Sequence, residues 1–177
     1  MEFKEYQKKA KTFCLYNKKV LAQCLELGLM EESGEIAGVI KKNYRDNKGK
    51  KDKKFKNKLL KELGDLTWYI ALSLDYMKIK DELISQQREL VIKDEKTSFT
   101  DEIDIVRSLN IATVSYLADN NKEDDMFTTI DLVESLYLIE ELAKLYGYTI
   151  SDVYEANIAK LTKRKKEGKI HGEGSDR

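Results

Sequence analysis

The sequence contains no proline among its 177 residues, and its hydrophobic residues form no long runs. The absence of proline, together with abundant Leu, Ile, Lys and Glu, favours helices over a β-sandwich. No apolar run approaches the roughly 20 residues that a membrane-spanning helix needs. The start of the chain, Met1 to Glu5, does not resemble a signal peptide. We therefore expect a cytoplasmic protein with no membrane partner.

An excess of charge of one sign is also absent. The chain has 32 basic and 32 acidic residues, for a net charge of zero, and charged residues make up 36% of it. A general nucleic-acid-binding protein is normally markedly basic, so we expect no nucleic-acid partner. The two cysteines, Cys14 and Cys24, provide neither a disulfide framework nor a paired-cysteine metal motif. This cysteine usage is typical of a protein from a reducing compartment.

Hydrophobic residues recur at helical spacing throughout the chain, and no block alternates with the period of two that a strand requires. The expected helices cover residues 3–18, 20–44, 55–77, 81–91, 100–117, 127–146 and 151–166. The sequence therefore predicts an all-α helical bundle. The expected domain is a single unit, 1–177, made of an acid-motif half at 1–92, a second helical half at 100–166 and a flexible tail at 168–177.

Polar and glycine residues mark where these helices are expected to begin and end. The stretch from Asn43 to Asn57 predicts a charged connector. Residues 100–103 resemble a helix N-cap followed by acidic residues. Gly147 predicts a helix C-terminus, and Ser151 is expected to cap the last helix.

The two halves also resemble each other weakly. The segment from Met77 to Asp81 resembles the segment from Tyr148 to Asp152, and each precedes a predicted helix. Residues 61–70 similarly resemble residues 130–139. The register of these two matches differs by two residues. They predict either an internal duplication or a chance similarity between amphipathic helices.

Four acidic residues form two pairs with the same spacing. Glu32 and Glu35 lie three residues apart, and Glu62 and Asp65 repeat this spacing on the next helix. Each pair therefore shares one helix face, although like charges at this spacing are unfavourable. If the two helices pack side by side, four carboxylates meet. Such oxygen-rich clusters suit Mg²⁺ or Mn²⁺. Spacing alone leaves open the alternative that these acids are ordinary solvated residues.

Two glycines accompany the acidic pairs inside the predicted helices. Gly34 and Gly64 each weaken a helix by roughly 1 kcal/mol relative to alanine. A bundle built only for stability has little reason to combine acids and glycines twice. We expect these glycines to permit a close approach of neighbouring helices.

The last predicted helix carries a polar row of opposite charge. Asn157, Lys160 and Arg164 lie at positions i, i+3 and i+7, on one helix face. An amide, an ammonium and a guanidinium in a row can form a binding site for a polyphosphate. The alternative is an ordinary basic helix C-terminus that complements the helix dipole.

The acidic motifs in their order resemble a known family. Glu31-Glu32-Ser33-Gly34-Glu35, followed by Glu62-Leu63-Gly64-Asp65, resembles the EExxE and ExxD motifs of the all-α nucleoside triphosphate pyrophosphohydrolases, the MazG-like family. The resemblance is closest to the short members found in bacteria and their phages. Residues 3–7, 62–71, 155–164 and 168–177 are also similar to these short members.

The resemblance implies Mg²⁺-dependent hydrolysis of a nucleoside triphosphate to the monophosphate and pyrophosphate, in nucleotide-pool house-cleaning or in control of a deoxynucleotide pool. Mn²⁺ in place of Mg²⁺ stays open. By this resemblance the metal ligands are Glu32, Glu35, Glu62 and Asp65. Catalytic roles fall on Glu31, Glu32 and Glu35, with Glu31 orienting the ligands or the water. The implied substrate-binding residues are Tyr69, Trp68, Asn157, Lys160 and Arg164.

Some implications of the resemblance have alternatives. Trp68 is expected either to line the base pocket or to belong to the core. The enzyme is either broad or specific for a base, as a dUTP or dCTP pyrophosphatase is. A non-catalytic helical module that binds a nucleotide or a partner is the alternative from another class.

The segment from about residue 78 to 146 departs from the short family members, which lack it. If the repeat is a true duplication, the first half keeps the acids and the second keeps Asn157 and Lys160, while Gln86 and Glu89 stand at their places in the first half. Asp131 would then be a remnant of the lost acids, as would Glu134. We expect either a homodimer or a pseudo-dimeric monomer with one composite site.

Overall fold

The computed structural model describes residues 1–94, 99, 101–118 and 125–169. These residues form helices and connectors, with no strand among them, which confirms the all-α prediction. The helices are α1 (Phe3–Lys11), α2 (Leu21–Asn47), α3 (Lys53–Tyr76), α4 (Asp81–Asp94), α5 (Glu102–Ala118), α6 (Asp125–Leu145) and α7 (Ile150–Lys166).

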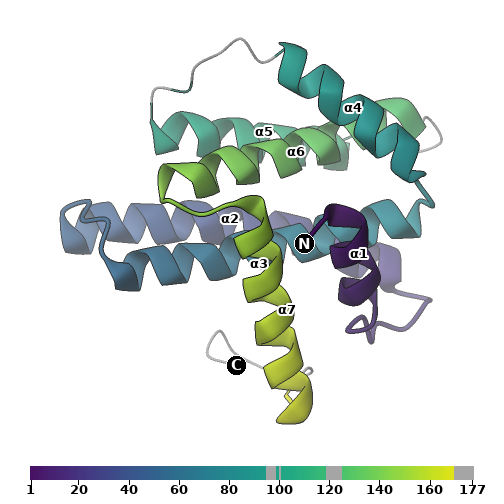
Figure 1. Ribbon diagram of the computed structural model, residues 1–177, viewed down its shortest axis with the longest axis horizontal. Helices are drawn as coiled ribbons and strands as arrows, with labels where there is room; N and C mark the ends of the chain where they lie inside the picture. The colour runs from purple at the N-terminus through teal and green to yellow at the C-terminus, as the bar shows by residue number, and fades with distance from the viewer. Residues whose placement is uncertain (95–98, 100, 119–124, 170–177) are drawn as a thin grey trace.

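Two antiparallel helix pairs, α2/α3 and α5/α6, stack on each other to form the centre of the molecule (Figure 1). Helix α2 packs on α5, and α3 packs on α6. Apolar side chains from all four helices meet between the layers, among them Leu29, Leu66, Leu109 and Ile139, each fully buried. The hydrophobic stripe of each helix therefore faces one shared core, as amphipathic helices require.

The remaining helices cover this core reciprocally. Helix α4 follows α3 in the chain but packs on α6 of the other pair, and α7 follows α6 but packs on α3. In Figure 1, α4 lies on the outer side of the α5/α6 pair and α7 runs steeply across the α2/α3 pair. Helix α1 packs on α3 and α7. The last helix of each half thus packs on the helix pair of the other half.

The turns after α3 and α6 have the same backbone geometry. Lys78 and Gly147 both have a positive φ, of 59° and 83°. The next amide closes the same bond in each turn, from Ile79 to the Leu74 carbonyl and from Tyr148 to the Ala143 carbonyl. These bonds align Lys78 with Gly147, in the register of the match between residues 61–70 and 130–139. The expected alignment of Met77 with Tyr148 is therefore wrong by two residues.

This register changes which residues of α4 stand where α7 carries its polar row. Arg88 corresponds to Asn157, and Val91 corresponds to Lys160, in place of the expected Gln86 and Glu89. Arg88 forms an ion pair with Glu140 of α6. At these positions α4 therefore carries an ion-paired arginine and a buried valine, where α7 carries Asn157 and Lys160.

Helix α1 ends seven residues earlier than the sequence predicts. The Thr12 hydroxyl donates to the Lys9 carbonyl at 2.7 Å, and the amides of Thr12 and Phe13 close the last turn. The chain then leaves the helix so that Phe13 is buried. The following segment carries Tyr16 towards α3, where its hydroxyl meets that of Tyr69.

The connector between α2 and α3 is shorter than expected. Helix α2 continues to Asn47, whose side-chain Nδ2 donates hydrogen bonds to the side chains of Asn43 and Asp52. Lys48 ends the helix in the left-handed conformation, with φ of 55°. Asp52 begins α3, because its carboxylate accepts the Phe55 amide at 2.8 Å. Short polar side chains that bond locally therefore extend both helices into the predicted loop.

The predicted caps are partly confirmed. Gly147 ends α6 with a positive φ, as expected. Helix α7 is capped by Thr149, not Ser151, because Thr149 and Asp152 form a reciprocal capping box. The carboxylate of Asp101 accepts the amides of Ile103 and Asp104 at the start of α5.

Two expectations concern membranes and the tail. Among the described residues, no helix combines the length and the apolar character needed to cross a bilayer. Of the tail predicted to be flexible, residues 170–177 lie outside the described part of the chain.

Candidate metal centre

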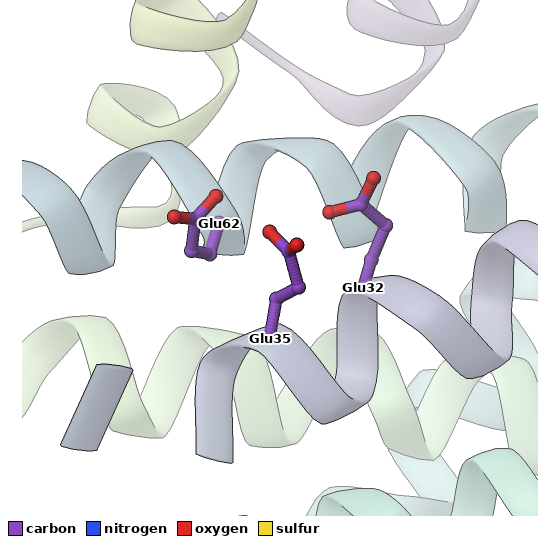
Figure 2. A group of neighbouring side chains, drawn as sticks. All are labelled: Glu32, Glu35 and Glu62. Atoms are coloured by element: carbon purple, nitrogen blue, oxygen red, sulfur yellow. The ribbon is translucent and has the colours of Figure 1, made fainter. Parts of the chain in front are cut away.

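Three of the predicted ligands converge between α2 and α3. Glu32 and Glu35 project from one face of α2, and Glu62 projects from α3 towards them (Figure 2). One carboxylate oxygen from each residue lies within 4.8 Å of the other two. The spacing of three residues places the first pair on one face, and the pairing of α2 with α3 supplies the third acid. We call these three residues the glutamate triad.

The triad holds more negative charge than its surroundings compensate. Burial, together with the charges of Asp65 and Glu35, raises the pKa of Glu32 to about 8. Burial also raises the pKa of Glu62. The Oε2 atom of Glu32 is buried and has no hydrogen-bond partner among the described residues. A buried carboxylate oxygen without a partner is unfavourable unless a proton or a cation binds it.

Asp65, the fourth predicted ligand, lies beside the triad and is held by α7. Its Oδ1 accepts a hydrogen bond from Asn157 Nδ2 at 3.2 Å, and its Oδ2 forms an ion pair with Lys160. Both side chains of the pair are about five-sixths buried, with 17% exposure. The structure therefore brings Asp65, Asn157 and Lys160 together, as expected, but directs this carboxylate towards α7.

The two glycines beside the acids differ in role. A Cβ atom added at Gly64 would lie 2.9 Å from the Cβ of Asn157, closer than side-chain atoms approach, so Gly64 permits α7 to pack tightly on α3. A Cβ atom at Gly34 would meet nothing within 4 Å. The expectation of close helix approach is thus confirmed for Gly64 and wrong for Gly34, which faces open space.

The aromatic residues after Asp65 contact protein groups. The Tyr69 hydroxyl lies 2.8 Å from the Tyr16 hydroxyl, and the Tyr69 ring packs across Gly28 of α2. The Trp68 indole donates to the Ala10 carbonyl at 3.2 Å and packs beside the small cluster that contains Tyr154. The arrangement of Trp68 corresponds to the alternative in which it belongs to the core.

The two remaining predicted residues are Glu31 on α2 and Arg164 on α7. Glu31 is exposed on α2 next to Glu32, and its charge contributes to the raised pKa of that residue. Arg164 is partly buried on α7, one turn beyond Lys160. The row of Asn157, Lys160 and Arg164 therefore begins at Asp65 and continues along α7.

Sequence reasoning missed two residues that hold the site together. Tyr6 is fully buried, and its hydroxyl donates to Asn157 Oδ1 at 2.9 Å. Tyr16 supports Tyr69 from the segment after α1. For Tyr6, the signal was its place in the N-terminal stretch that resembles the short MazG-like proteins. Nothing in the local sequence of Tyr16 distinguishes it from a surface aromatic residue.

The comparisons with known proteins add one partial match. The chain is 44% identical over 45 residues to the protein described as "Gene 37 protein" of Mycobacterium phage L5. The matched part is 25% of this chain and 40% of the phage protein, so it spans less than half the length of that relative. No protein family model matches the chain, and no solved structure matches it.

Proposed function

We propose that the chain is a Mg²⁺-dependent nucleoside triphosphate pyrophosphohydrolase that converts the triphosphate to the monophosphate and pyrophosphate. The observation that carries the proposal is the glutamate triad, with its buried, unpartnered Glu32 oxygen, facing a helix that presents Lys160. A hard divalent cation prefers such a set of carboxylate oxygens. The resemblance of the acidic motifs to the MazG-like family supports the same reaction.

The residues present fit a divalent cation. Glu32, Glu35 and Glu62 would hold it, with Asp65 within reach of the same charge cluster. Bound Mg²⁺, or Mn²⁺ in its place, would neutralise phosphate charge and make water a better nucleophile. The raised pKa of Glu32 means that this residue releases a proton when a cation binds.

Residues of this chain would accept the proton and bind the phosphates. Glu35, the exposed member of the triad, or its neighbour Glu31 would accept a proton from the attacking water. Lys160 is within reach of both Asp65 and the triad, so its ammonium group can turn to the departing pyrophosphate. Arg164, one turn further along α7, extends this basic row towards the outer phosphates.

The reciprocal packing of the helices supports a pseudo-dimer within one chain. Helix α7 from the second half completes the site on α2 and α3 of the first half. The counterpart positions on α6 are Asp131 and Glu134, and α6 packs on α4, which carries Arg88 and Val91. We infer one active site per chain, assembled without a second copy, with Asp131 and Glu134 as remnants.

The test is pyrophosphate release with Mg²⁺ across the eight common ribonucleoside and deoxyribonucleoside triphosphates. Wild type is compared with Glu35→Gln and Asp65→Asn, and with the double variant Asp131→Asn/Glu134→Gln as the matched control. We expect release by wild type and the control, and a loss of at least about 100-fold in the two site variants. A ranking dominated by one base would indicate the base-specific alternative. Release by none of the proteins would favour the non-catalytic binding module.

A further inference from the structure

Two hydrogen bonds among three side chains connect α1 to the acidic site. The Tyr6 hydroxyl donates to Asn157 Oδ1 at 2.9 Å, and Asn157 Nδ2 donates to Asp65 Oδ1 at 3.2 Å. Tyr6 is fully buried and Asn157 is 2% exposed. Two consecutive hydrogen bonds therefore link the helices α1, α7 and α3.

The direction of these hydrogen bonds follows from chemistry. The Asp65 carboxylate, paired with Lys160, only accepts hydrogen bonds, so Asn157 must present its amide nitrogen to it. The amide oxygen then faces Tyr6, whose hydroxyl must donate. Burial and the nearby charge of Asp65 raise the pKa of Tyr6, which keeps its proton available. A flipped amide would direct its oxygen at the carboxylate and leave its nitrogen facing a hydroxyl.

The packing leaves Asn157 little room to respond in another way. Its Cβ lies against Gly64, where a methyl group would already be too close. On the other side, Tyr6 stacks on Tyr154 with ring centroids 4.5 Å apart and ring planes at 15°. The amide can therefore rotate about its own side-chain bonds but cannot move away. The Asp65 carboxylate sets which end of the amide faces it, and the Tyr6 hydroxyl holds the amide oxygen at the other end.

We propose that Tyr6 is a positioning residue for the metal centre: its hydroxyl fixes the Asn157 amide, and the amide fixes the Asp65 carboxylate beside the glutamate triad. The effect would reach a bound cation through two intermediaries, Asn157 and Asp65, one more than for a hydrogen bond made directly to a metal ligand. The role of Asp65 in the cation site rests on the proposed function, whereas the orientation of the amide does not.

The first test observes the amide in the metal-free protein. The side-chain NH₂ signals of Asn157 in a ¹H–¹⁵N spectrum are assigned by their absence in Asn157→Ala. In Tyr6→Phe, which keeps the ring and its stacking, we expect these signals to shift and their exchange with water to accelerate at least about 10-fold. Tyr154→Phe removes a hydroxyl from the same aromatic stack without touching Asn157, and should leave the signals in place. Unchanged signals in Tyr6→Phe, or equal changes in both variants, would overturn the proposal.

The second test measures Mn²⁺ binding without nucleotide. Removal of a partner bonded directly to a ligand typically weakens metal affinity by about 10–100-fold. Because Tyr6 acts one bond further away, we expect Tyr6→Phe to weaken Mn²⁺ affinity by about 10-fold, at the low end of this range, while Tyr154→Phe binds like wild type. Equal affinity of Tyr6→Phe and wild type would contradict the link from Tyr6 to the cation. Neither test involves turnover, so a protein that hydrolyses no triphosphate would refute the proposed function and leave the Tyr6 result standing.

Discussion

Gly64 of α3 lies directly beneath Asn157 of α7, so closely that a Cβ atom at position 64 would be 2.9 Å from the Asn157 Cβ. This contact seats α7 on α3 and places Asn157 and Lys160 against Asp65. The two halves of the chain therefore meet at a glycine inside the acidic motif. This close contact explains why the motif contains a glycine, although glycine weakens a helix.

Replacement of this glycine should push α7 away from α3. Gly64→Ala gains helix propensity but overfills the contact, and we expect a net loss of roughly 1–2 kcal/mol in the free energy of unfolding. Gly34→Ala is the matched control, because its Cβ would meet nothing within 4 Å. The control should be stabilised by about 0.5–1 kcal/mol. Urea denaturation measures both, and a Gly64→Ala protein as stable as Gly34→Ala would contradict the tight contact.

The raised pKa of Glu32 predicts a pH dependence of stability in the metal-free protein. The folded protein holds the proton up to a pKa of about 8, whereas the unfolded chain releases it near 4.5. The folded state binds more protons between these values, so its stability falls as the pH rises through this window. Glu32→Gln lacks this fall. Above pH 8 it should be more stable than wild type by about 1–3 kcal/mol, and near pH 4.5 the two should be similar.

Urea unfolding at several pH values, with a chelator present, provides the measurement. Saturating Mn²⁺ should reverse the order above pH 8, because only wild type retains the full set of ligands. Parallel stability curves for the two proteins across the whole pH range would show that Glu32 titrates normally.

A substitution of Lys160 should lower turnover without weakening Mn²⁺ binding. Lys160→Met removes the positive partner of Asp65, which makes the acidic cluster more negative and so leaves Mn²⁺ affinity equal or higher. The same change removes a phosphate contact, and we expect turnover to fall by at least about 10-fold. Lys163→Met is the control, since Lys163 is on the same helix with its side chain 78% exposed. Parallel losses of Mn²⁺ affinity and turnover in Lys160→Met would show that Lys160 supports the fold of the site instead.

Gly28 should be as sensitive to substitution as Gly64. A methyl group at this position would overlap the Tyr69 ring, which the Tyr16 hydroxyl holds in place. We expect Gly28→Ala to reduce the free energy of unfolding by about 1–3 kcal/mol. Gly38→Ala, on the same helix and facing open space, should not be destabilised. The comparison fails if both variants unfold at the same urea concentration.

The helices and the glutamate triad could be predicted because both depend on local periodicity. Glu32 and Glu35 share a face in any α-helix, and the apolar stripe of α3 turns Glu62 towards α2. The end of α1 could not be predicted in this way. The residues after Lys11 continue the helical pattern, but the burial of Phe13 and the contact of Tyr16 with Tyr69 draw the chain out of the helix.

The rest of the site depends on contacts between residues far apart in the chain. Gly34 and Gly64 have similar acidic neighbours in sequence, yet only Gly64 has another helix above it. The Asp65 carboxylate turns to α7 because Asn157 and Lys160 arrive from the second half. Periodicity shows which face a residue occupies, but not which distant helix covers that face.

Product analysis in H₂¹⁸O tests the proposed reaction most directly. The protein is incubated with Mg²⁺ and its preferred triphosphate, and the masses of the separated products are measured by mass spectrometry. Glu35→Gln serves as the inactive reference. Attack of water on the α-phosphorus predicts ¹⁸O in the nucleoside monophosphate and unlabelled pyrophosphate. A nucleoside diphosphate with inorganic phosphate, or label in the pyrophosphate, would contradict the account.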